Sequence, residues 1–207
     1  MIRNVFLFLL PLLFLSSCIQ FPVVSTLTTA SSLSEKEVSL KLGNSARNFH
    51  LQLRKGIYRE DFWGIDTGVF VSYALPDKFF RSISFSVDTK VSVFENTSNT
   101  FATGIEVNYL LSEITNQSLN FLENSINIVF PVYLESSMTE WFKFLVNFRL
   151  FFNVVSFNNA RYVYPLTSIN VGFEFFKTFR MEGYLVSGKG VSSFPIPGLS
   201  LSYVFNF

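Results

Sequence analysis

The 207-residue sequence is poor in the residues from which catalytic and metal centres are most often built. Its one cysteine and one histidine exclude a disulfide framework and a zinc site with several such ligands. Charged residues make up 15% of the chain, against about 25% in average soluble domains. The net charge of +1 provides no basic surface for nucleic acid. No apolar run approaches the ~20 residues that a membrane-spanning helix requires.

The chain is nevertheless apolar, because 49% of its residues are hydrophobic and 27 of them are phenylalanine. Without a long apolar run, these residues must be spread over alternating segments. Residues 79–93 show this most clearly: Ile83, Phe85 and Val87 share one parity, and serines fill much of the other. Successive side chains of a strand point to opposite faces, so the pattern predicts strands with one apolar and one polar face.

Segments of this kind recur from residue 38 to the end of the sequence. They predict ten strands, at residues 38–42, 49–53, 65–75, 79–93, 101–111, 126–134, 142–154, 169–175, 179–185 and 199–207. We expect an all-β fold, a closed antiparallel up-and-down transmembrane β-barrel over residues 35–207, with eight strands as the alternative. Pro131 and Pro165 are expected to mark bulges or strand ends, because proline cannot donate to a strand ladder. A change of parity between Phe121 and Ile126 predicts a further bulge.

The first residues have the pattern of an export signal. Arg3 is followed by an apolar stretch over residues 5–15, which is too short to span a bilayer. The sequence Leu15-Ser16-Ser17-Cys18 then resembles the lipobox of bacterial lipoproteins. The resemblance implies cleavage before Cys18 and acyl chains, such as palmitate, on its sulfur and amine. An ordinary secretory signal with a free thiol is the alternative. We therefore expect a signal peptide at residues 1–17 and a lipidated N-terminus with a flexible tether at residues 18–34.

Residue size and charge predict which face of the barrel is outside. The polar face carries small residues, which fit a narrow lumen, and the apolar face carries bulky ones, which lipid can accommodate. The polar face also carries balanced charges, six carboxylates including Glu37 against six cations, which suits a partly desolvated lumen. From these we predict a lumen charge network of Asp66, Asp88, Lys90, Glu106, Lys143, Arg149 and Glu174.

The last nine residues alternate strictly and end on an aromatic residue. Tyr203, Phe205 and Phe207 resemble the C-terminal signature of bacterial outer-membrane β-barrels, and the resemblance implies recognition by the barrel-assembly machinery. It also implies an outer-membrane location with both termini in the periplasm. Trp63 and Trp141 then fall at periplasmic strand ends, where aromatic residues anchor a barrel in the interface.

His50 is the one candidate for acid–base catalysis. It has polar-face parity near the outer rim, and Ser45, Asp77 and Glu113 are the candidate partners, but none forms a spaced motif with it. The sequence has no Gly-rich phosphate loop and no Cys/His cluster, so neither a cofactor nor a metal is expected. Outer-membrane lipid is the expected environment, and no sequence feature identifies an extracellular partner.

We expect a non-enzymatic surface, structural or interaction role for this lipoprotein barrel. Three alternatives stay open at this point. The first is an outer-membrane enzyme that modifies lipid or peptide through His50. The second is a narrow channel for ions or small solutes. The third is a soluble periplasmic lipoprotein whose β-barrel binds an apolar ligand.

Overall fold

The computed structural model describes residues 27–45, 48–74, 80–96, 98–116, 119–157, 160–188 and 196–207. The predicted signal peptide, Cys18 and residues 19–26 lie outside this part of the chain. Within the described residues, no helix is long and apolar enough to cross a membrane.

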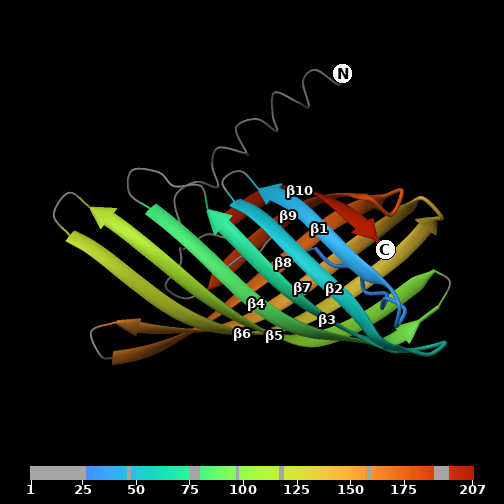
Figure 1. The fold of residues 1–207 in the computed structure, drawn as a ribbon, viewed down its shortest axis with the longest axis horizontal. Coiled ribbons are helices and arrows are strands. Elements are labelled where there is room, and N and C mark those ends of the chain that lie inside the picture. The colour runs from blue at the N-terminus through green and yellow to red at the C-terminus, as the bar shows by residue number, and fades with distance from the viewer. Residues whose placement is uncertain are drawn as a thin grey trace, which may run out of the picture.

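Ten antiparallel strands form a closed barrel, in which each strand pairs with the next along the chain and β1 pairs with β10 (Figure 1). The strands are β1 (Val38–Ser45), β2 (Asn48–Arg59), β3 (Gly64–Ala74), β4 (Phe80–Glu95), β5 (Asn99–Asn116), β6 (Leu119–Thr139), β7 (Phe142–Phe157), β8 (Ala160–Phe175), β9 (Phe179–Gly188) and β10 (Ile196–Asn206). The predicted fold class and strand number are confirmed, and the eight-strand alternative is wrong.

The two ends of the barrel differ. One end, here called the terminal end, carries Phe207, the start of β1 and the short connections at residues 60–63, 96–98, 140–141 and 176–178. At the opposite end, here called the far end, the β5–β6 and β7–β8 hairpins project beyond the barrel body (Figure 1). The β5–β6 ladder continues to Asn116 and Leu119, whereas described pairing between β6 and β7 stops at Asn124 and Ser156.

The bulges lie elsewhere than the sequence predicted. The β5–β6 register is the same on both sides of Pro131, and Pro131 itself pairs in register with Arg149. The register is also unbroken from Leu119 to Ile126, so neither predicted bulge forms. Pro165 pairs in register with Phe152, and it adjoins the last described pair of β8 with β9. A proline here omits one donor without adding a residue, so the register is kept.

Register shifts occur instead close to the terminal end. They lie between Gly56 and Tyr58, between Ser92 and Phe94, and between Ser137 and Thr139. Barrel rims are a common place for bulges, because the extra residue there increases the twist without breaking the middle of the ladder. A bulge therefore depends on position in the closed sheet more than on a local proline.

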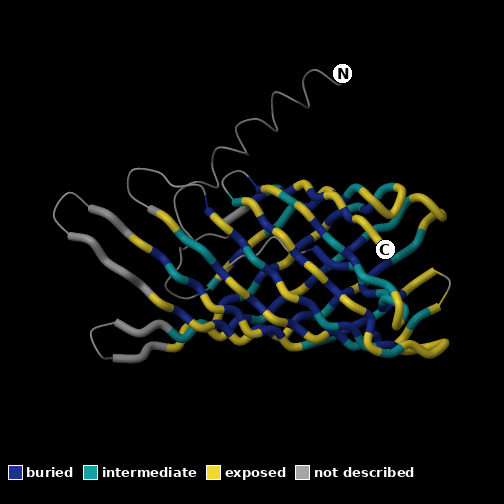
Figure 2. Tube along the Cα trace, viewed as in Figure 1, coloured by how far each residue is buried: buried dark blue, intermediate teal, exposed yellow. Residues whose placement is uncertain are grey.

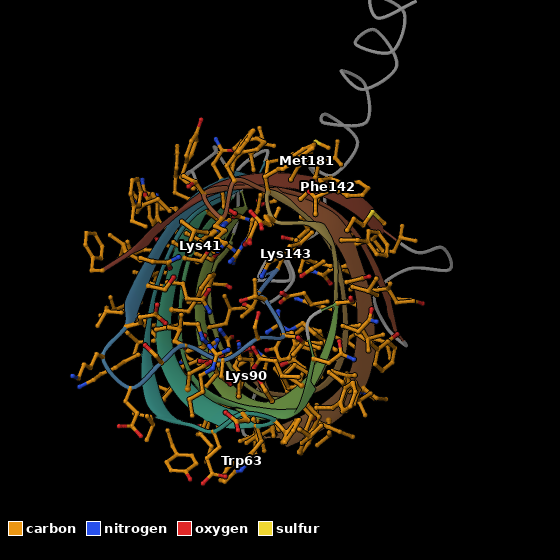
Figure 3. All side chains as sticks on the ribbon, turned by 90° about the vertical axis from the view of Figure 1, so that its right-hand side faces the viewer. Lys41, Trp63, Lys90, Phe142, Lys143 and Met181 are labelled. Carbon is orange, nitrogen blue, oxygen red and sulfur yellow. The ribbon has the colours of Figure 1, made fainter. Side chains whose placement is uncertain are left out.

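Exposure alternates along the strands, with apolar residues outside and polar residues inside (Figure 2). Val87 is 58% exposed, whereas its neighbour Asp88 is 8% exposed. Trp63 and Phe142 point outward, and Lys41 points into the lumen (Figure 3). Soluble proteins rarely expose apolar patches above a few hundred Å², and here the apolar surface surrounds the barrel. The predicted orientation, with the apolar face outside and the polar face lining the lumen, is confirmed.

Aromatic side chains gather near the terminal end. Trp141 stacks on Phe176 with ring centroids 5.7 Å apart, and Tyr58 packs on Trp63 at 4.8 Å. Both tryptophans are exposed on the outside of the barrel. They therefore lie at the same end as the C-terminus, where an interfacial belt is expected.

Candidate functional site

The barrel lumen gathers most of the charged side chains of the strands. Among the described residues it holds six cations and six carboxylates, namely Lys41, Arg54, Lys90, Lys143, Arg149 and Arg180 with Asp66, Asp88, Glu106, Glu135, Glu174 and Glu182. The sequence predicted Glu37 as one of the six lumen carboxylates, whereas in the structure the sixth is Glu135. The predicted strand ended at Leu134, one residue too early to include Glu135, whereas Glu37 lies at the terminal rim. The lumen is neutral, as desolvated charges require.

The first group of charges is centred on Arg54. Its guanidinium donates to Asp66 Oδ1 and Asp88 Oδ2, both at 2.8 Å, and Lys90 Nζ lies 3.0 Å from Asp66 Oδ2. Arg54 is on β2 and Asp88 on β4, so the side chain must cross β3. Gly68 is the β3 residue between them, and a Cβ there would lie 2.5 Å from Asp88 Oδ1. The missing side chain of Gly68 makes this ion pair possible.

Six of the eight remaining lumen charges form two further groups, whereas Lys41 and Glu182 hydrogen-bond the main chain of Leu27. Arg149 donates to Glu106, with the guanidinium also 5.0 Å from the ring centre of Phe151. In the other group, Lys143 Nζ lies 2.5 Å from Glu135 Oε1, and Arg180 Nε lies 2.6 Å from Glu174 Oε2. All seven residues of the predicted network are thus in the lumen, but in three groups. The predicted set lacked three of their ion-pair partners. These are Arg54, which pairs with Asp66 and Asp88, Glu135, which pairs with Lys143, and Arg180, which pairs with Glu174.

Residues 27–34 run inside the barrel. Leu27, Thr28, Ala30 and Ser32 are buried, and the blue start of the described chain crosses the lumen in Figure 3. The prediction of a flexible tether is therefore wrong for residues 27–34. The Ser/Thr-rich composition typical of a linker also gives the small side chains that fit a narrow lumen.

Lumen side chains, together with Arg59 at the terminal rim, bind this segment through its main chain. The carbonyl oxygens accept from Lys41 (Leu27 O, 2.9 Å), Lys90 (Thr29 O and Ser31 O, 2.7 Å each), Ser92 (Ala30 O, 2.6 Å) and Arg59 (Ser32 O, 2.5 Å). Two carboxylates accept from its N–H groups: Glu182 from Leu27 and Glu135 from Ser31, both at 3.1 Å. The segment is thereby held along its length.

The lumen contains bulky apolar residues as well as polar ones. Val129, Phe151, Leu166 and Val186 form a buried cluster on β6–β9, with Tyr184 packed against it. The small cavity beside Thr28, lined by Gln52, Phe70, Ser86, Asp88, Glu106 and Tyr133, leaves no room for a water molecule. At the level of these residues the lumen is a packed interior, as in other narrow barrels.

His50 lies in the lumen without a chemical partner. The residue is 4% exposed, its ring stacks on Phe70 with centroids 5.8 Å apart, and neither ring nitrogen makes a hydrogen bond. Ser45 hydrogen-bonds Tyr184 instead, Glu113 is exposed, and Asp77 lies outside the described residues. The described residues thus bring neither a nucleophile nor an orienting group to His50, as a general base would need. No three described His, Cys, Asp or Glu side chains converge as a metal site.

The lumen segment joins β1 through a turn at the terminal rim. The Ser34 N–H donates to Glu37 Oε2 at 2.8 Å, and the Glu37 N–H donates to Ser34 O at 3.0 Å. The Ser34 N–H stabilises the ionised carboxylate and holds the pKa of Glu37 below its ordinary value of 4.5. Glu37 thus fastens the base of the lumen segment.

Acid is expected to weaken the hydrogen bond between the Ser34 N–H and the Glu37 carboxylate. Because the pKa of Glu37 is lowered in the folded protein, its contribution to stability is complete above pH 4.5 and is lost as the pH falls through the lowered pKa. The wild type should therefore lose more stability than Glu37→Gln between about pH 7 and about pH 3, measured as the urea midpoint in detergent. Glu35→Gln, which removes an exposed carboxylate from the same turn, is the control. Its urea midpoint should depend on pH as that of the wild type does.

The C-terminal strand closes the barrel. The Val38 N–H donates to Phe207 O at 3.1 Å, and the Phe207 N–H donates to Val38 O at 2.9 Å. Tyr203, Phe205 and Phe207 are exposed on the outer face of this seam. The three residues of the predicted C-terminal signature therefore face outward along the seam at which the barrel closes.

The closed ladder, the apolar exterior and the polar lumen define a class. The chain is a small ten-stranded transmembrane β-barrel of the outer-membrane type.

No protein-family model matches the sequence, and no curated protein is recognisably similar to it. Several solved structures are similar in fold. LpxR from Salmonella typhimurium aligns over 82% of this chain and 99% of its own, with 6% identity and a TM-score of 0.41. The beta domain of the Bordetella autotransporter BrkA aligns over 82% and 97%, with 7% identity and a TM-score of 0.43. The NanC porin aligns over 82% and 98%, with 10% identity and a TM-score of 0.34.

Proposed function

We propose that the protein is an integral barrel of the bacterial outer membrane, anchored additionally by a lipid on Cys18, with a non-enzymatic surface or interaction role. The observation that carries this proposal is the filled lumen. Residues 27–34 and three groups of ion pairs occupy the interior, which leaves the loops and rims as the surfaces that meet other molecules. The projecting β5–β6 and β7–β8 hairpins are the candidate contact surface.

The alternatives each need a feature that the described residues do not provide. A channel needs an open passage, whereas the lumen segment is held at both its carbonyl and N–H groups. An enzyme acting through His50 needs a hydrogen-bonded partner for the imidazole. A carrier of apolar ligands needs an apolar cavity, whereas much of this lumen is charged.

We further propose that the terminal end faces the periplasm. Outer-membrane barrels have short periplasmic turns and longer extracellular extensions. Here every connection at the terminal end has two to four residues, and both projecting hairpins lie at the far end. The far-end hairpins would then lie outside the cell. Residues 19–26 would link the lipid on Cys18 to Leu27, a span of at most ~30 Å.

Matched cysteine variants test the location and the orientation together. Glu113→Cys places a thiol at the exposed far end, and Ser98→Cys places one at the exposed terminal end. We expect a membrane-impermeant maleimide to label Glu113→Cys on intact cells and Ser98→Cys only after permeabilisation. The reverse pattern would contradict the orientation. Recovery of the protein in a carbonate wash would contradict membrane insertion.

The lipid is tested separately by metabolic labelling with an alkyne fatty acid. The wild type should incorporate the label and Cys18→Ser should not. Both should stay in the membrane fraction and migrate faster on gels before boiling, because the apolar exterior of the barrel is sufficient to hold it in the membrane without the lipid on Cys18. If Cys18→Ser were released as a soluble protein, the soluble-carrier alternative would replace this proposal.

A further inference from the structure

We infer that the lumen is a binding site for a peptide main chain, and that residues 27–34 occupy it as an intramolecular plug that bends at Ala30 and Ser31. In place of the plug, the site would take another peptide with small side chains. This inference goes beyond the surface role proposed above, because it gives the barrel interior a ligand of defined chemistry.

The contacts with the plug are made mainly to its main chain. Lys90 alone donates to two carbonyls, Thr29 O and Ser31 O, at 2.7 Å each. Glu135 and Glu182 accept from the N–H groups of Ser31 and Leu27. Every peptide offers the same carbonyl and N–H groups, so a site built in this way recognises the course of the main chain more than a particular sequence.

Side-chain size supplies the selectivity. Ala30 is fully buried against Ala102 and Tyr133, so a larger residue at this position has no space. Gly56 lies beside the base of the plug, and a Cβ there would be 2.0 Å from Ser34 O. Its nearest neighbours all belong to the plug rather than to the barrel wall. The wall is therefore shaped to bring the main chain of the plug close to β2.

Removing the plug would leave the site intact but unsatisfied. Lys41 and Lys90 would lose their carbonyl partners, and Ser92 would lose its contact with Ala30 O. Buried polar groups without partners are costly, so water or another peptide would replace the plug. A second peptide main chain restores the same hydrogen bonds, which makes it the matching ligand.

The test uses a variant that lacks residues 27–34 and a fluorescent peptide of residues 25–34, STLTTASSLS. We expect saturable binding to the folded variant by fluorescence anisotropy and no binding to the wild type, whose site is occupied. Adding Lys90→Met should weaken binding at least about tenfold, since it removes two charge-assisted hydrogen bonds. Lys55→Met, on an exposed position of β2, is the control and should leave binding unchanged. The same peptide carrying Ala30→Trp should not bind.

Two results would overturn the inference: a folded deletion variant that binds no peptide, or one that binds the Ala30→Trp peptide equally well. If the deletion variant does not fold alone, refolding it with the peptide present should restore heat-modifiable gel mobility. A failure of the peptide to do so also overturns the inference.

The full-length chain provides an independent measurement. Gly56→Ala places a methyl group against Ser34 O and should loosen the plug, so that the full-length protein begins to bind the peptide. Gly183→Ala is the matched control, because its Cβ meets only ordinary contacts at 3.6 Å or more. Equal peptide binding by the two variants would contradict the role of residues 27–34 as the occupant.

Discussion

Replacing Arg54 by methionine is expected to lower the free energy of unfolding by about 3–5 kcal/mol. The Arg54 side chain is 6% exposed and bridges Asp66 and Asp88 across the position of Gly68. Its loss leaves buried carboxylates without their cation, and an unpaired buried charge is far more costly than a missing surface ion pair. Urea unfolding in detergent, followed by the fluorescence of Trp63 and Trp141, measures the change.

A double variant separates the unpaired charge from the lost packing. In Arg54→Met the carboxylate left without a cation is mainly Asp88, because Asp66 keeps Lys90 at 3.0 Å. Arg54→Met combined with Asp88→Asn should therefore recover a substantial part of the lost stability. A loss below about 1 kcal/mol in the single variant, the size typical of an exposed ion pair, would show that water screens this group.

Placing an arginine on the outer face, as Val87→Arg, is expected to destabilise the barrel by about 2–4 kcal/mol. Val87 is 58% exposed, pairs with Val107 of β5, and lies midway along β4. If this face contacts the hydrocarbon core, the guanidinium must be buried in lipid or must distort the bilayer. If the face contacted water, the substitution would change stability by no more than about 0.5 kcal/mol.

Val93→Arg is the matched control on the same strand. Val93 is 49% exposed and lies near the terminal end, two residues before Glu95. There an arginine can reach the interface, so the expected loss is only about 0–1 kcal/mol. Reversible unfolding from lipid vesicles measures both variants. Equal effects at the two depths would contradict a membrane-embedded exterior.

The sequence was sufficient to predict the number of strands and which face of each strand lies outside, because alternation is a local property. Each strand shows its two faces over a few consecutive residues, and the sizes of Ser84 and Phe85 already indicate which face can fit inside a narrow barrel. The same reasoning failed at Pro131, where a local signal predicted a bulge and the ladders on either side kept the register.

The lumen site could be predicted only in part. Parity placed Asp66, Asp88, Lys90 and Glu106 on one face, but it could not say which charges would meet. Glu135 was missed because the alternating segment was ended at Leu134, although β6 continues to Thr139. Residues 27–34 have no periodicity, and nothing in their composition distinguishes a solvated linker from a buried plug.

By itself, the sequence determined that this protein is an all-β chain with a lipid-facing apolar side and a neutral polar side. Only the tertiary structure decided the ion pairs and the course of residues 27–34. The physical reason is that strand tilt and closure bring distant residues to the same level of the lumen, as when Arg54 reaches Asp88 over Gly68. A segment without its own pattern is ordered by the hydrogen-bonding groups that surround it, and these exist only once the barrel has closed.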